Sequence, residues 1–572
     1  MTRRSVTAVA LIAALSVASV FVVWQRAPRA QAVSQRLEQL DSLVGRIRHA
    51  ESRFPLRALG SSSAGRLDTL AQRWPAVRAM VKRRLGPGFV PETVVNARVR
   101  TAQRRNPAVS SPNLSLTRFS GFTQNETATA WCGPNVVVGF NDTAAEVETL
   151  AATTAGVSLD GYSVSSHRGA GFRYLGPLPP ASDPNTMLNG DPSLACASAD
   201  DFYYSSLWFD ATDKLVGVAL SRSTDGGNDF SAPQPVVAKD YLTHFIDWDR
   251  LVSDPAHPDL IYLTYTDFDT TGAFCGLDGD GDAVLESSIQ VVSSTDAGAT
   301  WSAPSVIAPT CATNHAADES DSLYPVVHDS SVAVGPDGEI YVAWEGIAGD
   351  GVSREIDFAS SAAGGQNFST PVTVHAADCA GGCGDLQGYI RITEAPAIAV
   401  DTSRKSSSGT IYVAWTDGDA AVPDSLSGSY AFTDVLLSSS TNGGAQWSSP
   451  VRVDNSTGAA RPGVPVDHFE PAIAVDRTGR VAVCFYDRRR DPTNFSIDRY
   501  CASSKNRGVT WSNRRITAQS FPSLVAQDLL NPVDYMGDYD TLAADFLNLT
   551  AGFRGAYADN SSGNPEVRIN SF

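Results

Sequence analysis

Hydrophobic and polar residues alternate in short runs along most of this chain, and the runs recur at a regular spacing. The runs are rich in Val, Ile, Ala and aromatic residues and are bounded by Gly, Pro, Asn or Asp, as at 396–401 and 471–476. Short runs of this kind between turn-forming residues predict β-strands rather than helices. The pattern therefore predicts an all-β body over residues 112–572.

An eight-residue phrase marks the repeat. It has Ser first, Gly fifth, Trp or Phe eighth and, in four of its six copies, Asp or Asn third; the two weaker copies have His167 and Ala363 there, and the copies lie 58 to 79 residues apart. We expect its acidic or amide side chain to accept turn N–H groups, its Gly to adopt a turn conformation and its aromatic ring to pack into the sheet. The residues given this structural role are Asp225, Asp296, Asn442, Asn506, Phe230, Trp301, Trp447 and Trp511.

A second phrase, an apolar run ending in aromatic–x–Asp, precedes each eight-residue phrase and occurs seven times, as in Phe485-Tyr-Asp487. A further short apolar run precedes this phrase in each unit. Each unit is therefore predicted to form a four-stranded antiparallel sheet. Stacked units of this period predict a seven-bladed β-propeller, with six blades as the alternative. The seventh unit stops at Phe572 before its last strand, and residues 114–119 are expected to supply that strand and close the ring.

The N-terminal part differs from the body in hydropathy and charge. Residues 6–24 are apolar and uncharged and follow Arg3 and Arg4, which predicts a cleavable signal or a membrane anchor within residues 1–32. Either one places the body outside the cytoplasm. Residues 33–111 are basic and show helical spacing at Leu37, Leu40 and Leu43, which predicts a partly helical stalk, either solvated or lying on the membrane.

Charge narrows the classes of partner. Residues 33–105 hold 15 Lys or Arg against 5 Asp or Glu, so the body is more acidic than the chain total of −18. An acidic body disfavours nucleic acid and suits cations such as Ca²⁺. The segment Asp278-Gly-Asp280-Gly-Asp282, with Glu286 after it, alternates carboxylates as calcium loops do and predicts a Ca²⁺ site. No organic cofactor is expected.

Eight cysteines lie in the body, an even number that favours disulfides in an exported chain. Sequence alone leaves 105 connectivities open. Positions within the repeat favour Cys132 with Cys196, Cys275 with Cys311, Cys379 with Cys383, and Cys484 with Cys501.

The eight-residue phrase resembles the Asp-box, or bacterial neuraminidase repeat, of the sialidase-like propellers. The pattern Ser-x-Asp-x-Gly-x-Thr-Trp is met in full from Ser294 to Trp301, and the resemblance covers about 460 residues. It implies that the Asp-box turns lie on the face opposite the active site. The functional face, here called the loop face, would then be built from the starts of the first strands and from the loops between second and third strands.

Carboxylates recur at equivalent places on the expected loop face: Glu126, Asp191, Asp249, Asp329, Glu394, Glu470, and Asp538 or Asp540. The resemblance implies a sialidase-like site with a tyrosine nucleophile, a glutamate behind it, an aspartate acid or base, and three arginines. The candidates are Tyr535, Tyr539, Glu394, Glu470, Asp249, Arg250, Arg391 and Arg488. The family's Arg-x-Pro motif is absent, because Gln124-Asn-Glu-Thr127 stands in its place.

Two hypotheses follow. The first is an exported or membrane-tethered propeller, expected to be monomeric, that binds carbohydrate on its loop face and acts as a sialidase-like glycoside hydrolase. The alternative is a non-catalytic propeller that serves as a binding or scaffold protein.

Overall fold

The structure is a computed structural model that describes most of the chain after residue 32. The described residues are 33–46, 48–49, 62–85, 109, 122–152, 155–279, 281–312, 325–349, 353–362, 364–377, 385–386, 390–424, 428–455, 466–523, 528, 530, 535–562 and 565–572. Within these ranges no helix is both long enough and apolar enough to cross a membrane. The predicted signal or anchor, residues 1–32, lies outside them.

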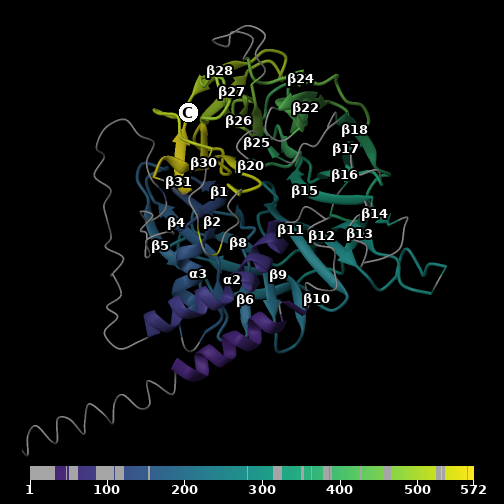
Figure 1. The fold of residues 1–572 in the computed structure, drawn as a ribbon. Coiled ribbons are helices and arrows are strands. Elements are labelled where there is room, and N and C mark those ends of the chain that lie inside the picture. Colours follow the sequence, from purple (N-terminus) through teal and green to yellow (C-terminus); the bar gives the residue numbers. More distant parts are fainter. Residues whose placement is uncertain are drawn as a thin grey trace, which may run out of the picture.

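Seven antiparallel sheets surround a central axis (Figure 1), so the predicted seven-bladed β-propeller is confirmed. Blade 1 contains β1 (Gln124–Cys132), β2 (Asn135–Asp142), β4 (Asp160–Ser165) and β5 (Arg173–Pro177). Blade 2 contains β7 (Ser193–Cys196), β8 (Phe202–Asp210), β9 (Leu215–Ser223) and β10 (Gln234–Asp240), with β6 (Thr186–Leu188) and β3 (Val157–Ser158) added beside β8. Blade 3 contains β11 (His244–Ser253), β12 (Ile261–Asp269), β13 (Glu286–Ser294) and β14 (Ser305–Cys311).

The remaining blades repeat this plan. Blade 4 contains β15 (Val326–Val334), β16 (Ile340–Ile347), β17 (Arg354–Ser361) and β18 (Val372–Ala377), and a short hairpin, β19 (Asp385–Leu386) with β20 (Ile390–Arg391), follows it. Blade 5 contains β21 (Ala397–Val400), β22 (Ile411–Asp424), β23 (Gly428–Ser440) and β24 (Val451–Arg452). Blade 6 contains β25 (His468–Val475), β26 (Val481–Asp487), β27 (Asp498–Ser504) and β28 (Ser512–Arg515). Blade 7 contains β29 (Leu542–Ala544), β30 (Phe553–Asp559) and β31 (Glu566–Ser571), with the 3₁₀ turn η2 (Asn560–Ser562) between the last two.

Blade 7 is joined by a residue from the N-terminal side of the propeller. The backbone N–H of Val109 donates to the carbonyl of Val567 on β31 at 2.9 Å, and the Ser163 hydroxyl of blade 1 donates to the Val109 carbonyl at 2.5 Å. Val109 therefore links the last blade to the first. The strand predicted at residues 114–119 lies outside the described residues.

The eight-residue phrases form turns between the third and fourth strands. In the copy after β13, the Ser294 hydroxyl donates to Asp296 at 2.8 Å and accepts from the Gly298 N–H at 2.9 Å. The Asp296 carboxylate accepts from the Thr300 N–H at 2.8 Å, and Gly298 has a φ of 85° that favours glycine. These bonds satisfy turn backbone groups locally, which is a structural task.

Three disulfide bonds confirm the corresponding predicted pairs: Cys132–Cys196, Cys275–Cys311 and Cys484–Cys501. The first joins blade 1 to blade 2, and the last crosses between neighbouring strands of blade 6. The predicted Cys379–Cys383 pair lies outside the described residues.

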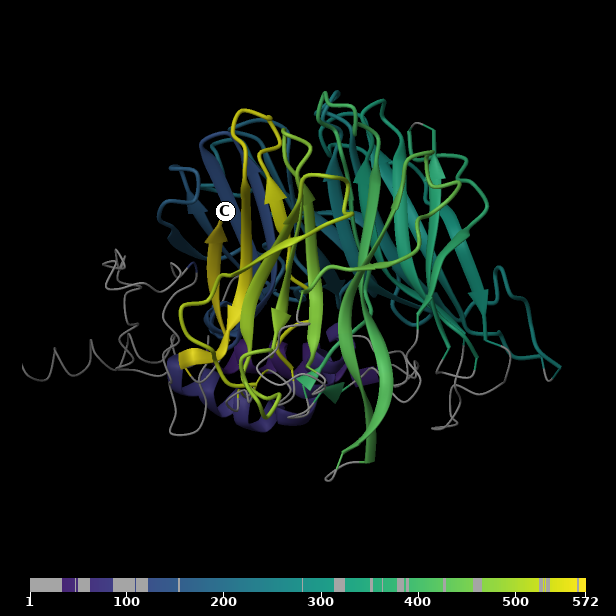
Figure 2. The ribbon, with the colours of Figure 1, turned by 90° about the horizontal axis from the view of Figure 1, so that it is seen from above.

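Two N-terminal helices pack against the propeller instead of standing free of it. One covers residues 33–46 and the other is α2 (Ser62–Leu85), and Figure 2 shows them beneath the blades. Their apolar stripes, which include Leu40 and Val77, share one core with Val147 of α3 (Thr143–Leu150) and with Phe209 at the end of β8. Because these partners lie in or beside the loops that follow second strands, the helices cover part of the loop face.

Candidate functional site

The innermost strands of the blades share an unusual backbone feature at the loop face. Four of them, β1, β11, β15 and β25, carry a break in register with the neighbouring strand. Non-glycine residues with left-handed φ angles of 51° to 57° stand at these breaks and just before β7: Glu126, Asp191, Trp248, Asp329 and Glu470. Such conformations cost on the order of 1 kcal/mol and bulges re-aim side chains, so their recurrence in five blades makes this rim a candidate for the functional site.

The predicted carboxylates of the rim are buried and influence one another across blades. Each is less than a tenth exposed: Glu126, Asp191, Asp249, Asp329, Glu394, Glu470, Asp538 and Asp540. Glu470 on β25, for example, interacts electrostatically with Asp538 and Asp540 from blade 7 and with Glu126 from blade 1. The structure thus brings residues from opposite ends of the chain to one place.

A cavity of about 210 Å³ lies among the innermost strands. Its polar wall is formed by Arg250, Glu470, Asp538, Tyr539 and Asp540, and small side chains such as Thr129, Ser193 and Ser331 complete it. A concave site with a few convergent polar groups is the usual form of a ligand site, although this cavity is smaller than the roughly 300–1,000 Å³ of most.

Arg250 contacts two aromatic rings in this wall, and the rings also contact each other. Its guanidinium carbon is 3.7 Å from the centroid of Tyr539 and 4.4 Å from that of Trp248, and the two rings are 5.2 Å apart. The Tyr539 hydroxyl donates to the Pro192 carbonyl at 3.1 Å. Burial raises the pKa of Tyr539 well above 10, against the effect of Arg250, so the phenol stays protonated.

Arg391 and Asp538 form the second charged group of the site. One guanidinium nitrogen of Arg391 lies 2.7 Å and 2.6 Å from the two carboxylate oxygens of Asp538. The same guanidinium lies 5.1 Å from the Tyr535 ring. Burial lowers the pKa of Arg391, but the carboxylates of Asp538, Glu126 and Asp329 outweigh burial and raise it, so the guanidinium stays charged.

Glu470 is a buried carboxyl group of the cavity wall. Its Oε1 is buried and has no hydrogen-bond partner among the residues that the structure describes. Burial, with the charges of Asp540 and Asp538, raises the pKa of Glu470 well above its usual range, and Arg499 only partly opposes this. This shift favours the protonated form of the Glu470 carboxyl group.

Glu394 lies beside a partner that sequence reasoning missed, Glu345 on β16. Arg354 approaches both, with Nη1 at 3.2 Å from Glu345 Oε1 and Nε at 3.4 Å from Glu394 Oε2. Burial raises the pKa of Glu345 to about 7, and burial together with Glu345 raises the pKa of Glu394 well above its usual range. The two glutamates therefore retain a proton. The sequence did contain a feature that could have identified Glu345. Trp344-Glu-Gly346 is the copy of the aromatic–x–Asp phrase that has Glu in the middle and Gly in place of Asp.

A buried histidine adjoins this pair. His328 on β15 is flanked by Asp247, 3.2 Å from Nε2, and by Asp329, which pairs with Nδ1. Burial lowers the pKa of His328, but the carboxylates of Asp329 and Asp247 outweigh burial and raise it well above 6.5. The ring is an imidazolium that compensates part of the negative charge of the rim.

Five of the predicted catalytic residues do not line the cavity: Asp249, Arg488, Glu394, Arg391 and Tyr535. Arg488 is fully buried, with Nη1 2.8 Å from Asp467 and Nη2 2.9 Å from the Ser523 hydroxyl, so it holds neighbouring loops together. Asp249 accepts from the Ser205 hydroxyl and does not line the cavity. Burial and the nearby charge of Asp191 raise the pKa of Asp249 well above its usual range, despite Ser205 and Arg250.

The predicted calcium residues make local contacts. The Asp278 carboxylate accepts from the Asp282 N–H at 2.9 Å, and Glu286 Oε2 accepts from the N–H groups of Phe274 and Cys275 at 3.1 Å and 2.8 Å. Asp280 lies outside the described residues. Calcium binding stays a prediction.

No protein-family model matches the chain, and no curated protein matches its sequence. Solved structures do resemble it. The GH93 α-L-arabinofuranosidase of Fusarium graminearum in complex with arabinobiose is 11% identical over 67% of this chain and 92% of its own, with a TM-score of 0.39. The α-L-arabinanase of Penicillium chrysogenum is 12% identical over 66% and 92%, also with 0.39. The intramolecular trans-sialidase of Ruminococcus gnavus is 10% identical over 82% and 97%, with 0.37. Similarity at this level carries no information about substrate.

Proposed function

We propose that the central cavity binds a carbohydrate and that the protein hydrolyses a glycosidic bond there, with Glu470 as the general acid. The observation that carries this proposal is a carboxyl group that lines the cavity, that has one buried oxygen without a hydrogen-bond partner among the described residues, and whose pKa is raised by burial. Glycoside hydrolysis needs such an acid to protonate the leaving oxygen. The resemblance to sialidase-like propellers agrees with it.

In this proposal the second catalytic carboxyl group, which acts beside Glu470, is that of Asp538. Arg391 donates to both of its oxygens, and an arginine in this position favours the ionised form. Two carboxyl groups in different protonation states are what an acid and its partner base or nucleophile require. Asp538 is therefore assigned the partner role.

The cluster of Trp248, Arg250 and Tyr539 supplies the recognition surface. Their rings and guanidinium form a stiff wall beside Glu470, and the small cavity volume suits one sugar unit. Tyr539 serves in this proposal as part of that surface, because its protonated, hydrogen-bonded phenol is poorly suited to act as a nucleophile. Whether the sugar is a sialoside or an arabinoside is left to the assay.

The alternative is a non-catalytic carbohydrate-binding propeller. The observation that favours it is burial, since Glu470 and Tyr539 are only 5% and 8% exposed. Under either proposal the three disulfides fit a protein that matures outside the cytoplasm. Membrane tethering through residues 1–32 and a monomeric state belong to the proposal as well.

The test is release of a fluorescent aglycone from a panel of glycosides that includes sialosides and α-L-arabinofuranosides. We expect Glu470→Gln to lower kcat by a hundredfold or more, and kcat of the wild type to fall as pH rises through the raised pKa of Glu470. Glu148→Gln, at an exposed carboxylate of α3, is the control and should change kcat less than twofold. Turnover that survives Glu470→Gln contradicts the assigned role, and no turnover on any glycoside, with binding retained, supports the non-catalytic alternative.

A further inference from the structure

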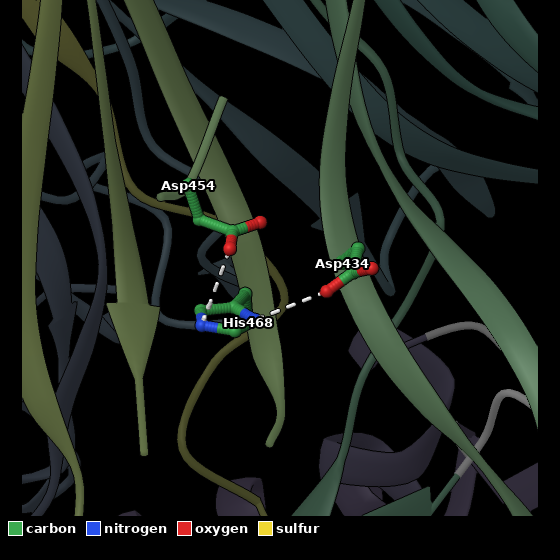
Figure 3. Close-up of side chains that lie close together, drawn as sticks. All are labelled: Asp434, Asp454 and His468. Atoms are coloured by element: carbon green, nitrogen blue, oxygen red, sulfur yellow. Dashed lines mark hydrogen bonds and ion pairs between the residues drawn. The ribbon is translucent and has the colours of Figure 1, made fainter. Parts of the chain in front are cut away.

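Three carboxylates surround a buried histidine between blades 5 and 6, away from the cavity. Asp434 comes from β23, Asp454 follows β24, His468 begins β25, and Asp487 ends β26. The side chains of Asp454, His468 and Asp487 are completely buried. Figure 3 shows Asp434 and Asp454 at different nitrogens of the imidazole ring.

The two ring nitrogens have different surroundings. Nδ1 lies 3.2 Å from Asp434 Oδ1, which is hydrogen-bond distance. Nε2 lies 3.5 Å from Asp487 Oδ2 and 3.6 Å from Asp454 Oδ1, and it has no hydrogen-bond partner among the described residues. A buried nitrogen thus faces two anionic oxygens at distances beyond the 2.7–3.2 Å range of N–H···O bonds.

The two distances from Nε2 match those between ligands of one metal ion. Zinc binds imidazole nitrogen and carboxylate oxygen at about 2.0–2.2 Å, which in tetrahedral geometry separates the ligand atoms by about 3.4 Å. A carboxylate that accepts from the other ring N–H is the usual support of a metal-binding histidine, and Asp434 occupies that place. We propose that His468 Nε2, Asp454 and Asp487 bind a divalent transition-metal ion of the zinc type.

Two arginines hold the carboxylates of this site. Arg452 Nε lies 2.8 Å and 2.9 Å from the two oxygens of Asp454, and Arg489 Nε lies 2.6 Å from Asp487 Oδ2. They fix the orientation of both ligands and offset part of the negative charge. A second proton on His468 is the alternative to a metal ion. The resulting imidazolium would also offset the negative charge of the three carboxylates that the two arginines leave uncompensated.

The metal would tie two neighbouring blades together. Asp454 belongs to blade 5, whereas His468 and Asp487 belong to blade 6. His468 also lies two residues before Glu470 on β25. The test of metal binding does not depend on the proposed hydrolase activity, because it measures the number of metal ions bound per chain.

The test uses the full chain, purified without a polyhistidine tag. ZnCl₂ is added to the apoprotein in the presence of excess Ca²⁺ and Mg²⁺, free metal is removed, and bound zinc is measured by mass spectrometry. The ligand variants are His468→Gln and Asp487→Asn, which keep the size of the side chain. The matched control is His244→Gln, because His244 begins β11 in the same way and lies 3.0 Å from Asp267.

We expect about one zinc ion per wild-type chain and per His244→Gln chain, and at least a tenfold lower stoichiometry in both ligand variants. If His468→Gln fails to fold, the comparison of the zinc stoichiometry of Asp487→Asn with that of the wild type tests the proposal. Wild-type protein that retains less than a tenth of an equivalent shows that a proton occupies His468 and overturns the proposal. Zinc that persists in the ligand variants, or that is lost in His244→Gln, overturns it as well.

Discussion

The guanidinium of Arg250 lies over the ring of Tyr539, 3.7 Å from its centroid, in the wall of the central cavity. A buried cation–π contact of this kind is worth up to about 2 kcal/mol and fixes both side chains. The arrangement fixes the Tyr539 ring and its hydrogen-bonded phenol, which suits a recognition surface.

Replacement of the Tyr539 hydroxyl distinguishes this recognition role from that of a nucleophile. Tyr539→Phe keeps the ring over Arg250 and removes only the bond to the Pro192 carbonyl, which should lower the free energy of unfolding by about 1 kcal/mol. We expect kcat to fall less than tenfold in steady-state assays. Tyr539→Leu removes the ring and should raise KM tenfold or more. A thousandfold loss of kcat in Tyr539→Phe would instead identify Tyr539 as the nucleophile.

The Glu345–Glu394 pair predicts how stability depends on pH. The pKa of Glu345 is about 7 when folded, against 4.5 as its ordinary value, so the folded state binds more protons between these pH values. Stability should therefore fall as pH rises from about 4.5 to about 7 and level off above that, by at most roughly 3 kcal/mol for this group.

Glu345→Gln removes this titration while it preserves the shape of the side chain. The variant should lose less stability than the wild type between pH 5 and pH 8 in urea unfolding. Glu355→Gln, at an exposed position of neighbouring β17, is the control and should follow the wild type. Equal slopes for Glu345→Gln and the wild type would show that Glu345 ionises normally in the folded protein.

The architecture was predictable from the sequence because it rests on local chemistry. The turn from Ser294 to Trp301 forms hydrogen bonds among its own residues, and each blade pairs strands that are neighbours in sequence. Period and turn chemistry therefore sufficed to count the blades. Disulfide pairs such as Cys484–Cys501 followed, because neighbouring strands place their residues opposite one another.

The candidate site was only partly predictable, because it depends on contacts between blades. The carboxylates were identified from their equivalent positions in the repeat. The contact between Glu345 of blade 4 and Glu394, which precedes the first strand of blade 5, forms only when these two blades pack together. Arg488 was a candidate because it follows the second strand of blade 6, yet its side chain turns to Asp467 and Ser523. Periodicity specifies where a residue stands along a strand and not which neighbour pairs with its side chain.

The Asp278 loop gives a separate prediction. Calcium should raise the midpoint of thermal unfolding of the full chain, and a chelator should lower it, because cation binding to the folded state stabilises it. Asp278→Asn should remove the calcium response, whereas Asp337→Asn, at an exposed turn between β15 and β16, should keep it. A midpoint unaffected by calcium and chelator would show that the loop closes through its own N–H groups alone.

The docked N-terminal helices depend on one buried cation. Arg36 is 1% exposed and donates at 3.3 Å to the carbonyls of Thr149, Leu150 and Pro184, and burial lowers its pKa to about 10. Arg36→Met fills the space but leaves these carbonyls without their donor, which should cost about 2 kcal/mol.

This loss of stability should weaken the docking of the N-terminal helices and leave the stability of the blades unchanged. We expect Arg36→Met to speed hydrogen exchange of α2 at least tenfold, because its docking to the propeller is weakened, while exchange in β12 is unchanged. Arg48→Met, at an exposed position of the same N-terminal region, is the matched control and should exchange as the wild type does. Unchanged protection of α2 in Arg36→Met would mean that the apolar contacts around Leu40 and Val77 suffice to hold the helices on the loop face.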